Sequence, residues 1–197
     1  MRTDYLNPQL YNRLYSCMTY SNVLALRVSL ETGLRIDDVL SLRFEDLKGR
    51  TLRGIAEKTD KPFKKTISLD LANRLKRMGH SGYIFPHRTK PNEHRTRQAV
   101  WSNMKKAARQ LGVDVNAAPH SARKTYAVEV FNDKGIEVAK RELQHDRLST
   151  TMLYCFSNML SCQEQQRKTF DLKEIDTICE LIAEKVVKKL QENKKTS

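Results

Sequence analysis

Long hydrophobic runs, closely spaced cysteine pairs and internal repeats are all missing from this sequence. No apolar stretch approaches the ~18 residues that a membrane-spanning helix needs, and the opening MRTDYLNPQLYNR is not a secretion signal. The four cysteines, Cys17, Cys155, Cys162 and Cys179, form no CxxC motif and have no spacing typical of metal ligands. These absences argue against a membrane-spanning or secreted protein, and we expect reduced thiols in a cytoplasmic, nucleoid-associated protein.

Acidic residues are too few to balance the basic ones. The sequence has 36 Lys and Arg against 23 Asp and Glu, a net charge of +13. Residues 171–197 contain equal numbers of acids and bases, so the whole excess lies in residues 1–170. With 39% hydrophobic residues in a chain of 197, that region is long enough for one well-buried core. A folded body with this charge indicates a polyanionic partner, nucleic acid before a membrane surface.

Hydrophobic periodicity predicts a mostly helical chain. Asn7 and Pro8 are typical of an N-cap and first helical position, and one helix or a pair should extend to about Ser29. Gly33 interrupts the pattern before a short helix. Apolar residues at helical spacing predict further helices, which would start after Asp70 as the cap, near Val100 with a stop at Gly112, and at His120 with an end at Gly135.

One stretch has the alternation of strands instead. In TLRGIAEKTDKPFKKTISL, β-branched residues flank TDKP, which predicts a hairpin with strands near 51–58 and 64–69 and with Pro62 in its turn. The expected fold class is therefore α+β, mostly helical, with a small antiparallel β-sheet.

The stretch HSARKTYAVEVF places a histidine and an arginine one helical turn apart. His120 and Arg123 share one face of a helix, where both could reach a single small anion. Ala127, Val130 and Phe131 form the face that should pack. Taken alone, the motif is more typical of a solvated basic face at the start of a core helix.

Four segments in order carry more information than any one of them: TGLRIDDVLSLR, EKTDKPFKKTISL, HSARKTYA and LQHDRLSTTMLY. Together they resemble the catalytic domain of tyrosine recombinases, the phage integrase family. Its patterns are GLRxxExLxLRxxD, a lysine in a β-hairpin, HxxR on a helix, and LGHxxxxTTxxY. The resemblance covers about residues 20–157, and its most specific part is HDRLSTTMLY, in which His145 precedes Tyr154 by nine residues.

The resemblance implies roles for seven residues. Tyr154 would be the nucleophile, and Asp38, at the family's acidic position, would orient an arginine one helical turn away, a surface carboxylate being the alternative. The pocket that activates the phosphate would consist of Arg35, Lys58, His120, Arg123 and His145. Lys61, in the same hairpin, is the substitute for Lys58, because the family position is loosely defined there.

These residue types suit attack on a phosphodiester. Guanidinium groups are planar, permanently charged forks for the non-bridging oxygens, and a lysine can protonate the departing 5′-oxygen. Histidines titrate near neutrality, which fits proton handling and hydrogen bonding to the phosphate. A tyrosine phenolate forms a covalent 3′-phosphotyrosyl ester that stores the bond energy, so the resemblance implies no metal and no cofactor.

The chain departs from the family pattern at three points. Gln144 replaces the usual glycine before His145, which could alter the turn, and Lys124 stands where many members have a second histidine. Lys124 is expected to add a cation without taking part in the chemistry. The typical N-terminal core-binding domain has no counterpart, because only about twenty residues precede the region of resemblance. Either a minimal recombinase or the catalytic fragment of a longer protein fits.

We therefore expect a catalytic domain over residues 1–160, with an N-terminal helix region at 1–19, and a C-terminal amphipathic helix over 161–197. That helix either packs within the chain or docks onto a neighbouring subunit. The predicted function is site-specific recombination of double-stranded DNA, with self-association on DNA and accessory DNA-bending proteins. A type IB topoisomerase-like enzyme, or a DNA-binding regulator that has lost the chemistry, are the alternatives.

Overall fold

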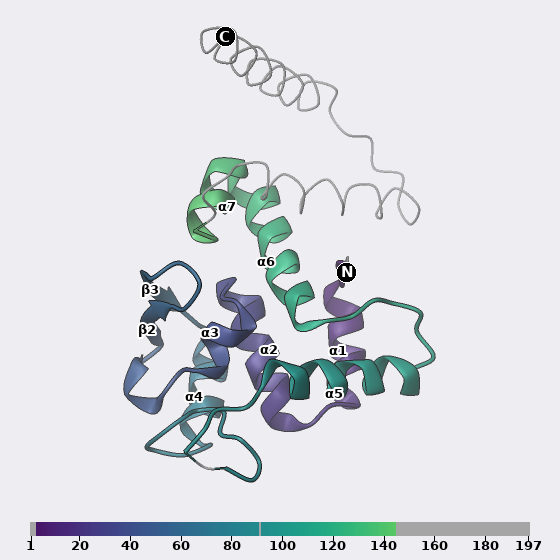
Figure 1. The fold of residues 1–197 in the computed structure, drawn as a ribbon. Helices are drawn as coiled ribbons and strands as arrows, with labels where there is room; N and C mark the ends of the chain where they lie inside the picture. Colours follow the sequence, from purple (N-terminus) through teal and green to yellow (C-terminus); the bar gives the residue numbers. More distant parts are fainter. Residues whose placement is uncertain (1–2, 91, 145–197) are drawn as a thin grey trace, which may run out of the picture. The chain divides into compact units, whose positions relative to one another are not determined.

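The computed structural model describes residues 3–90 and 92–144. Predictions that fall on residues 145–197, among them those for His145, Tyr154 and the amphipathic C-terminal run, lie outside the described residues. The elements, drawn in Figure 1, are α1 (Pro8–Ser16), α2 (Tyr20–Thr32), α3 (Ile36–Leu40), η1 (Phe44–Asp46), β1 (Leu47–Lys48), β2 (Thr51–Ala56), β3 (Lys61–Thr66), α4 (Leu69–Lys76), α5 (Arg97–Gln110), α6 (Pro119–Lys134) and α7 (Ile136–Glu142). This confirms the predicted fold class.

The first part of the chain forms the predicted pair of helices. The side chain of Asn7 caps α1 by accepting a 2.8 Å hydrogen bond from the Leu10 amide, and Pro8 is the first helical residue. α2 ends at Gly33, whose φ of +71° is left-handed and whose amide donates to the Ser29 carbonyl. The glycine turn thus separates α2 from α3, as predicted, because a residue without a Cβ adopts this conformation freely.

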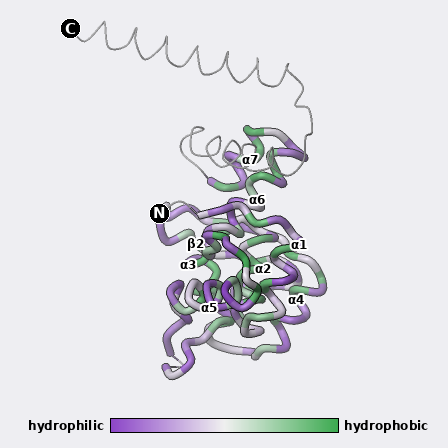
Figure 2. The backbone as a smooth tube through the Cα atoms, turned by 90° about the vertical axis from the view of Figure 1, so that its right-hand side faces the viewer, coloured by the Kyte–Doolittle hydropathy of each residue, from purple (hydrophilic) through white to green (hydrophobic). Residues whose placement is uncertain are grey.

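α2 is the central helix of the described body. Three consecutive residues, Leu24, Ala25 and Leu26, are all buried, and because neighbours on a helix point about 100° apart, α2 is covered on several sides. It packs against α3, α4 and α6. Figure 2 shows hydrophobic residues along α2, which lies among the other helices. Among the described residues, no helix is both long and apolar enough to cross a membrane.

The sheet has three antiparallel strands in the order β1-β2-β3. The predicted hairpin is present, but its strands end earlier: Ala56 pairs with Lys61, and the turn spans residues 57–60. Pro62 was expected in that turn and instead lies in β3 opposite Ile55. Proline is tolerated there because β3 is an edge strand, where a missing amide need not break the sheet. The short β1 carried no pattern in the sequence.

α4 begins two residues before the position that the sequence suggested. Ser68, not Asp70, is the N-cap, and its hydroxyl accepts from the Leu71 amide at 3.3 Å. Asp70 lies within the first turn, where its carboxylate accepts hydrogen bonds from Arg27 and Arg74. Serine and aspartate are both good caps, and neighbouring contacts that a sequence does not reveal decide between them.

Replacing Gly33 with alanine should destabilise the fold. A Cβ there would collide with the Tyr126 ring, and the left-handed backbone disfavours any side chain. We expect Gly33→Ala to lower the free energy of unfolding by about 3 kcal/mol, measured by urea denaturation. Gly112→Ala is the matched control, because Gly112 has a similar φ of +62° and open space around it; about 1 kcal/mol is expected. Equal losses in both variants would contradict the packing argument.

Candidate active site

Arg35 lies at the junction between α2 and α3. It is the N-cap residue of α3, directly after the turn at Gly33 and Leu34. Its guanidinium is partly exposed and donates no hydrogen bond within the described residues, and Nη1 lies 4.0 Å from Oδ2 of Asp38. The side chain therefore keeps all its donors for an incoming anion.

Asp38 is buried and connects two of the predicted site elements. One carboxylate oxygen, Oδ2, faces Arg35, and the other, Oδ1, accepts a 2.9 Å hydrogen bond from the backbone amide of Glu57. Glu57 is the first residue of the hairpin turn and the neighbour of Lys58. Asp38 is thus no surface carboxylate: it attaches the hairpin turn to the helix that begins at Arg35.

Lys58 and Lys61 are both exposed on the β2–β3 hairpin. Lys58 lies in the turn and makes no hydrogen bond or ion pair within the described residues, and Lys61 is the first residue of β3. Farther along β3, the Lys65 ammonium donates to both the carbonyl and the carboxylate of Glu142 at the end of α7. Lys65 is therefore engaged in a contact between the hairpin and α7.

Arg123 is buried on α6 and joins three parts of the fold. Its Nη1 donates to the Gly33 carbonyl and its Nη2 donates to the Leu143 carbonyl, both at 2.6 Å. Gly33 lies two residues before Arg35, and Leu143 lies two residues before His145. The guanidinium is consequently held in one orientation next to the segment that carries the other predicted arginine.

His120 lies in the first turn of α6, one residue after Pro119. Part of the His120 residue remains exposed, but its ring is largely withdrawn from water. This burial, and then the positive charges of Arg123 and Lys124, lower the pKa of His120 to about 4. Arg35 and Arg97 act in the same direction, which places both near the imidazole. The imidazole is therefore neutral at physiological pH.

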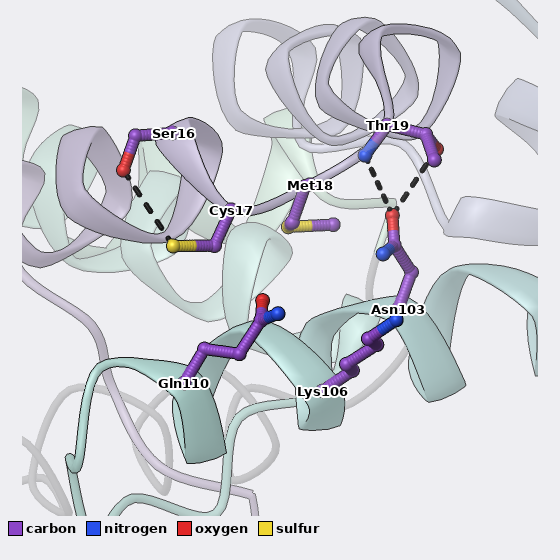
Figure 3. A pocket seen from close by; sticks show the side chains of 7 residues that line it. All are labelled: Ser16, Cys17, Met18, Thr19, Asn103, Lys106 and Gln110. Atoms are coloured by element: carbon purple, nitrogen blue, oxygen red, sulfur yellow. Dashed lines mark hydrogen bonds between the residues drawn. The ribbon is translucent and has the colours of Figure 1, made fainter.

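His120 also lines a pocket of about 440 Å³ together with Arg97, Gln98 and Trp101 of α5. A second hollow of about 600 Å³ lies between the α1–α2 turn and α5 (Figure 3). There the Asn103 side chain accepts hydrogen bonds from the amide and hydroxyl of Thr19. None of the predicted catalytic residues in the described part of the chain lines this second hollow.

Lys124 is buried, although the sequence indicated only an added cation. Its ammonium donates a hydrogen bond to the Thr3 carbonyl. The next residue, Thr125, donates from its hydroxyl to the Leu6 carbonyl at 2.9 Å. The N-terminal segment thus packs along the helix that carries His120 and Arg123, and it covers the cation that acts on His120.

Removing the Lys124 charge should raise the pKa of His120, because a neighbouring cation disfavours the imidazolium form. In the unchanged protein, NMR titration of the His120 ring should give a midpoint near pH 4, and Lys124→Met should move this midpoint upward towards 6.5. Lys106→Met, which removes an exposed lysine of α5, is the control and should leave the midpoint in place. An unchanged midpoint in Lys124→Met would contradict the assigned cause.

The structure brings together Arg35, Asp38, Arg123 and His120, and it attaches the Lys58 turn to this group through Asp38. His145 and Tyr154 lie outside the described residues. Within the described part, no group of three or more His, Cys, Asp or Glu side chains is placed to hold a metal ion.

Sequence reasoning missed the polar contacts between β3 and the end of α7. Lys65 binds Glu142, and the Tyr126 hydroxyl also donates to the Glu142 carboxylate, at 3.3 Å. Burial and the negative charge of Glu142 raise the pKa of Tyr126 to about 12. No periodicity or motif signals such a contact, because its members are separated by up to 77 positions in the sequence.

Comparison with known proteins supports the resemblance independently. The chain is 27% identical over 139 residues to the tyrosine recombinase XerD of Lacticaseibacillus casei, which covers 62% of this chain and 46% of the relative. The chain thus spans about half the length of the curated relatives it matches.

Solved structures share the fold. A lambda integrase dimer bound to a COC′ core site superimposes with a TM-score of 0.68 at 16% identity, covering 87% of this chain and 51% of that one. The catalytic domain of bacteriophage HP1 integrase gives a TM-score of 0.58 at 18% identity, covering 84% of this chain and 96% of that one. The model of the phage integrase family matches residues 4–160. By this match, which includes every segment that carries the sequence motifs, the chain belongs to the phage integrase family.

Proposed function

We propose that this chain is the catalytic unit of a site-specific recombinase that cleaves and rejoins double-stranded DNA through a 3′-phosphotyrosyl intermediate. The relatives named above are recombinases and integrases, and one of their structures is bound to its DNA core site. The observation that carries the proposal is the connected polar group of Arg123, Gly33, Arg35, Asp38 and Glu57, which gathers two arginines from separate segments and attaches the hairpin turn to them through the Glu57 amide.

This group suits a pentavalent phosphorus transition state. Arg35 donates no hydrogen bond within the described residues, and Arg123 is held in a fixed orientation by the two carbonyls that it binds. Both would bind the non-bridging oxygens of one phosphate, where negative charge increases as the reaction proceeds. Arg123 is in place before DNA arrives, which is the arrangement that lowers a barrier most.

The proposed reaction is a single transesterification. The Tyr154 phenol gives its proton to the neutral imidazole of His120 as its oxygen bonds to phosphorus. The bond from phosphorus to the 5′-oxygen breaks at the same centre, and the Lys58 ammonium protonates that oxygen. The product is a 3′-phosphotyrosyl ester and a free 5′-hydroxyl. Attack by a different 5′-hydroxyl reverses the proton transfers and rejoins the strand.

The low pKa of His120 agrees with a base role once DNA is bound. In the free protein, burial and then the neighbouring positive charges disfavour a proton on the imidazole. A bound phosphodiester adds a negative charge among those cations, which raises the basicity of the ring. His120 would therefore start the reaction unprotonated and gain proton affinity on DNA.

Exposed cations on the hairpin support DNA as the partner. Arg53 and Lys64 pair across β2 and β3, and Lys58 and Lys61 lie at the end of the same hairpin. Such a row binds backbone phosphates without reading sequence. We include in the proposal assembly of several copies on DNA, with residues 161–197 docking onto a neighbouring copy, DNA-bending accessory proteins, and a nucleoid-associated location in the cytoplasm.

The test is covalent trapping on DNA. The protein is incubated with nicked duplexes that carry a randomised segment, so that the short fragment beyond the nick is lost after cleavage and the ester cannot reverse. We expect a protein–DNA band that survives a denaturing gel, and sequencing of the trapped DNA then gives the site. If the protein retards the DNA on a native gel but never forms a covalent complex with it, the proposal is overturned in favour of a DNA-binding regulator. Relaxation of supercoiled plasmid without strand exchange would favour a topoisomerase-like enzyme.

A further inference from the structure

Gln144 has a backbone conformation that its residue type disfavours. Its φ is +51°, in the left-handed region, and it lies directly before His145, where related sequences usually have glycine. A side chain in this conformation costs roughly 1–2 kcal/mol relative to glycine. The chain therefore keeps the glycine-type turn with a glutamine in it, and a favourable contact of the glutamine side chain would offset the cost of this backbone conformation.

The Gln144 side chain makes such a contact with the β2–β3 hairpin. The Gln144 side-chain amide, through Nε2, donates a 3.0 Å hydrogen bond to the carbonyl of Pro62 in β3. Glycine at this position could not make the bond. A few residues along β3, the Lys65 ammonium binds both the carbonyl and the carboxylate of Glu142. β3 is thus attached to the end of α7 by side chains from both partners.

The two ends of the hairpin turn are held by different parts of the site. At the start of the turn, the Glu57 amide donates to Asp38, which faces Arg35. Just after the turn, Pro62 accepts from Gln144. Lys58 lies between these two attachments, and its own exposed side chain makes no hydrogen bond or ion pair within the described residues. The backbone contacts therefore determine where the Lys58 ammonium can reach.

We infer that Gln144 is a positioning residue, whose amide holds the β2–β3 hairpin so that Lys58 delivers its proton to the departing 5′-oxygen. The inference rests on the proposed function, which makes Lys58 the donor. It adds that the turn before His145 and the hairpin are joined by a side chain, so that these two parts of the site are set in place together. A displacement of about 1 Å in such a donor can cost a factor of 100 in rate.

The test changes the leaving group. The substrate is a duplex with the cleavage site identified by covalent trapping. It carries either the normal 5′-oxygen or a 5′-bridging sulfur at the scissile phosphate, and cleavage is followed in a single turnover. Sulfur needs no proton to depart, because thiols ionise near pH 8.5. We expect Gln144→Gly and Gln144→Met to cleave the oxygen substrate about 10- to 100-fold more slowly and the sulfur substrate at nearly the unchanged rate.

Three controls separate the explanations. Gln144→Gly also relieves the left-handed backbone, so a thermal midpoint no lower than that of the unchanged protein shows that a slow rate does not come from misfolding. Gln110→Met makes the same side-chain change at an exposed position at the end of α5 and should leave both rates unchanged. Lys58→Ala should lose the oxygen reaction by at least about 100-fold and recover on sulfur.

The outcomes are distinguishable. If Lys58→Ala recovers on sulfur and the Gln144 variants are equally slow on both substrates, Gln144 does not act through Lys58 and this inference alone is overturned. If Lys58→Ala fails to recover, Lys58 is not the proton donor, and that part of the proposed function is overturned together with the inference. Full activity of both Gln144 variants on oxygen would also overturn it.

Discussion

Replacing Tyr154 with phenylalanine should abolish the covalent protein–DNA band. The substitution removes only the phenolic oxygen that would bond to phosphorus, and no other group can form the 3′-ester. Loss of a nucleophile reduces turnover by many orders of magnitude, so we expect a decrease of at least ~10⁴-fold, below detection on a denaturing gel. The measurement is the yield of the covalent complex on the nicked duplex after a long incubation.

The Tyr154→Phe variant should still bind DNA. Retardation on a native gel should therefore match that of the unchanged protein, which shows that the loss concerns chemistry. Tyr126→Phe is a matched control elsewhere in the chain, because its hydroxyl contacts Glu142 and has no assigned role in the reaction. A covalent band that persists in Tyr154→Phe would show that another residue is the nucleophile.

Arg35→Ala and Arg123→Ala should both slow cleavage severely, by about 100- to 1000-fold, because each removes a proposed donor to the charged oxygens. Their effects on stability should differ. Arg35 has one partner, a carboxylate 4.0 Å away, so its loss should leave unfolding nearly unchanged. Loss of Arg123 leaves the Gly33 and Leu143 carbonyls without their donors in a buried site, which should cost about 3 kcal/mol.

Cleavage rates and urea denaturation curves measure the two effects separately. Arg123→Lys restores the charge without the fork and should recover little of the cleavage rate, since a compact ammonium lacks the planar guanidinium that spans the Gly33 and Leu143 carbonyls. Arg77→Ala removes an exposed arginine at the end of α4 and serves as the control for the overall charge. If Arg35→Ala and Arg123→Ala destabilise the protein equally, the buried carbonyl contacts do not have the role assigned to them.

The sequence predicted the ends of helices better than the positions of residues that depend on neighbours in space. The helix boundaries at Asn7, Gly33 and Gly135 follow from local chemistry, and the structure confirms them. Pro62 and Asp70 were placed wrongly because their positions depend on neighbours in space. An edge strand admits Pro62, and hydrogen bonds from Arg27 and Arg74 hold Asp70 inside the first turn of its helix.

The contacts between distant residues could not be predicted from the sequence at all. Asp38 was expected to orient Arg35, but nothing in the sequence shows that it also binds the Glu57 amide. Lys124 was interpreted as an extra cation, whereas its hydrogen bond to the Thr3 carbonyl makes it a buried, fixed charge that acts on His120. In each case the residue type was visible and its partner was not, because the pairing depends on how the helices pack.

The two arginines differ in what they lose when a phosphate binds. Arg123 gave up its rotamer freedom during folding, when its guanidinium bonded to two carbonyls. Arg35, which donates no hydrogen bond within the described residues, still has that conformational entropy, worth up to about 2 kcal/mol for a long side chain. In the proposed complex, ordering of Arg35 would therefore oppose DNA binding, because Arg123 is rigid from the start whereas Arg35 would become ordered only when the phosphate binds.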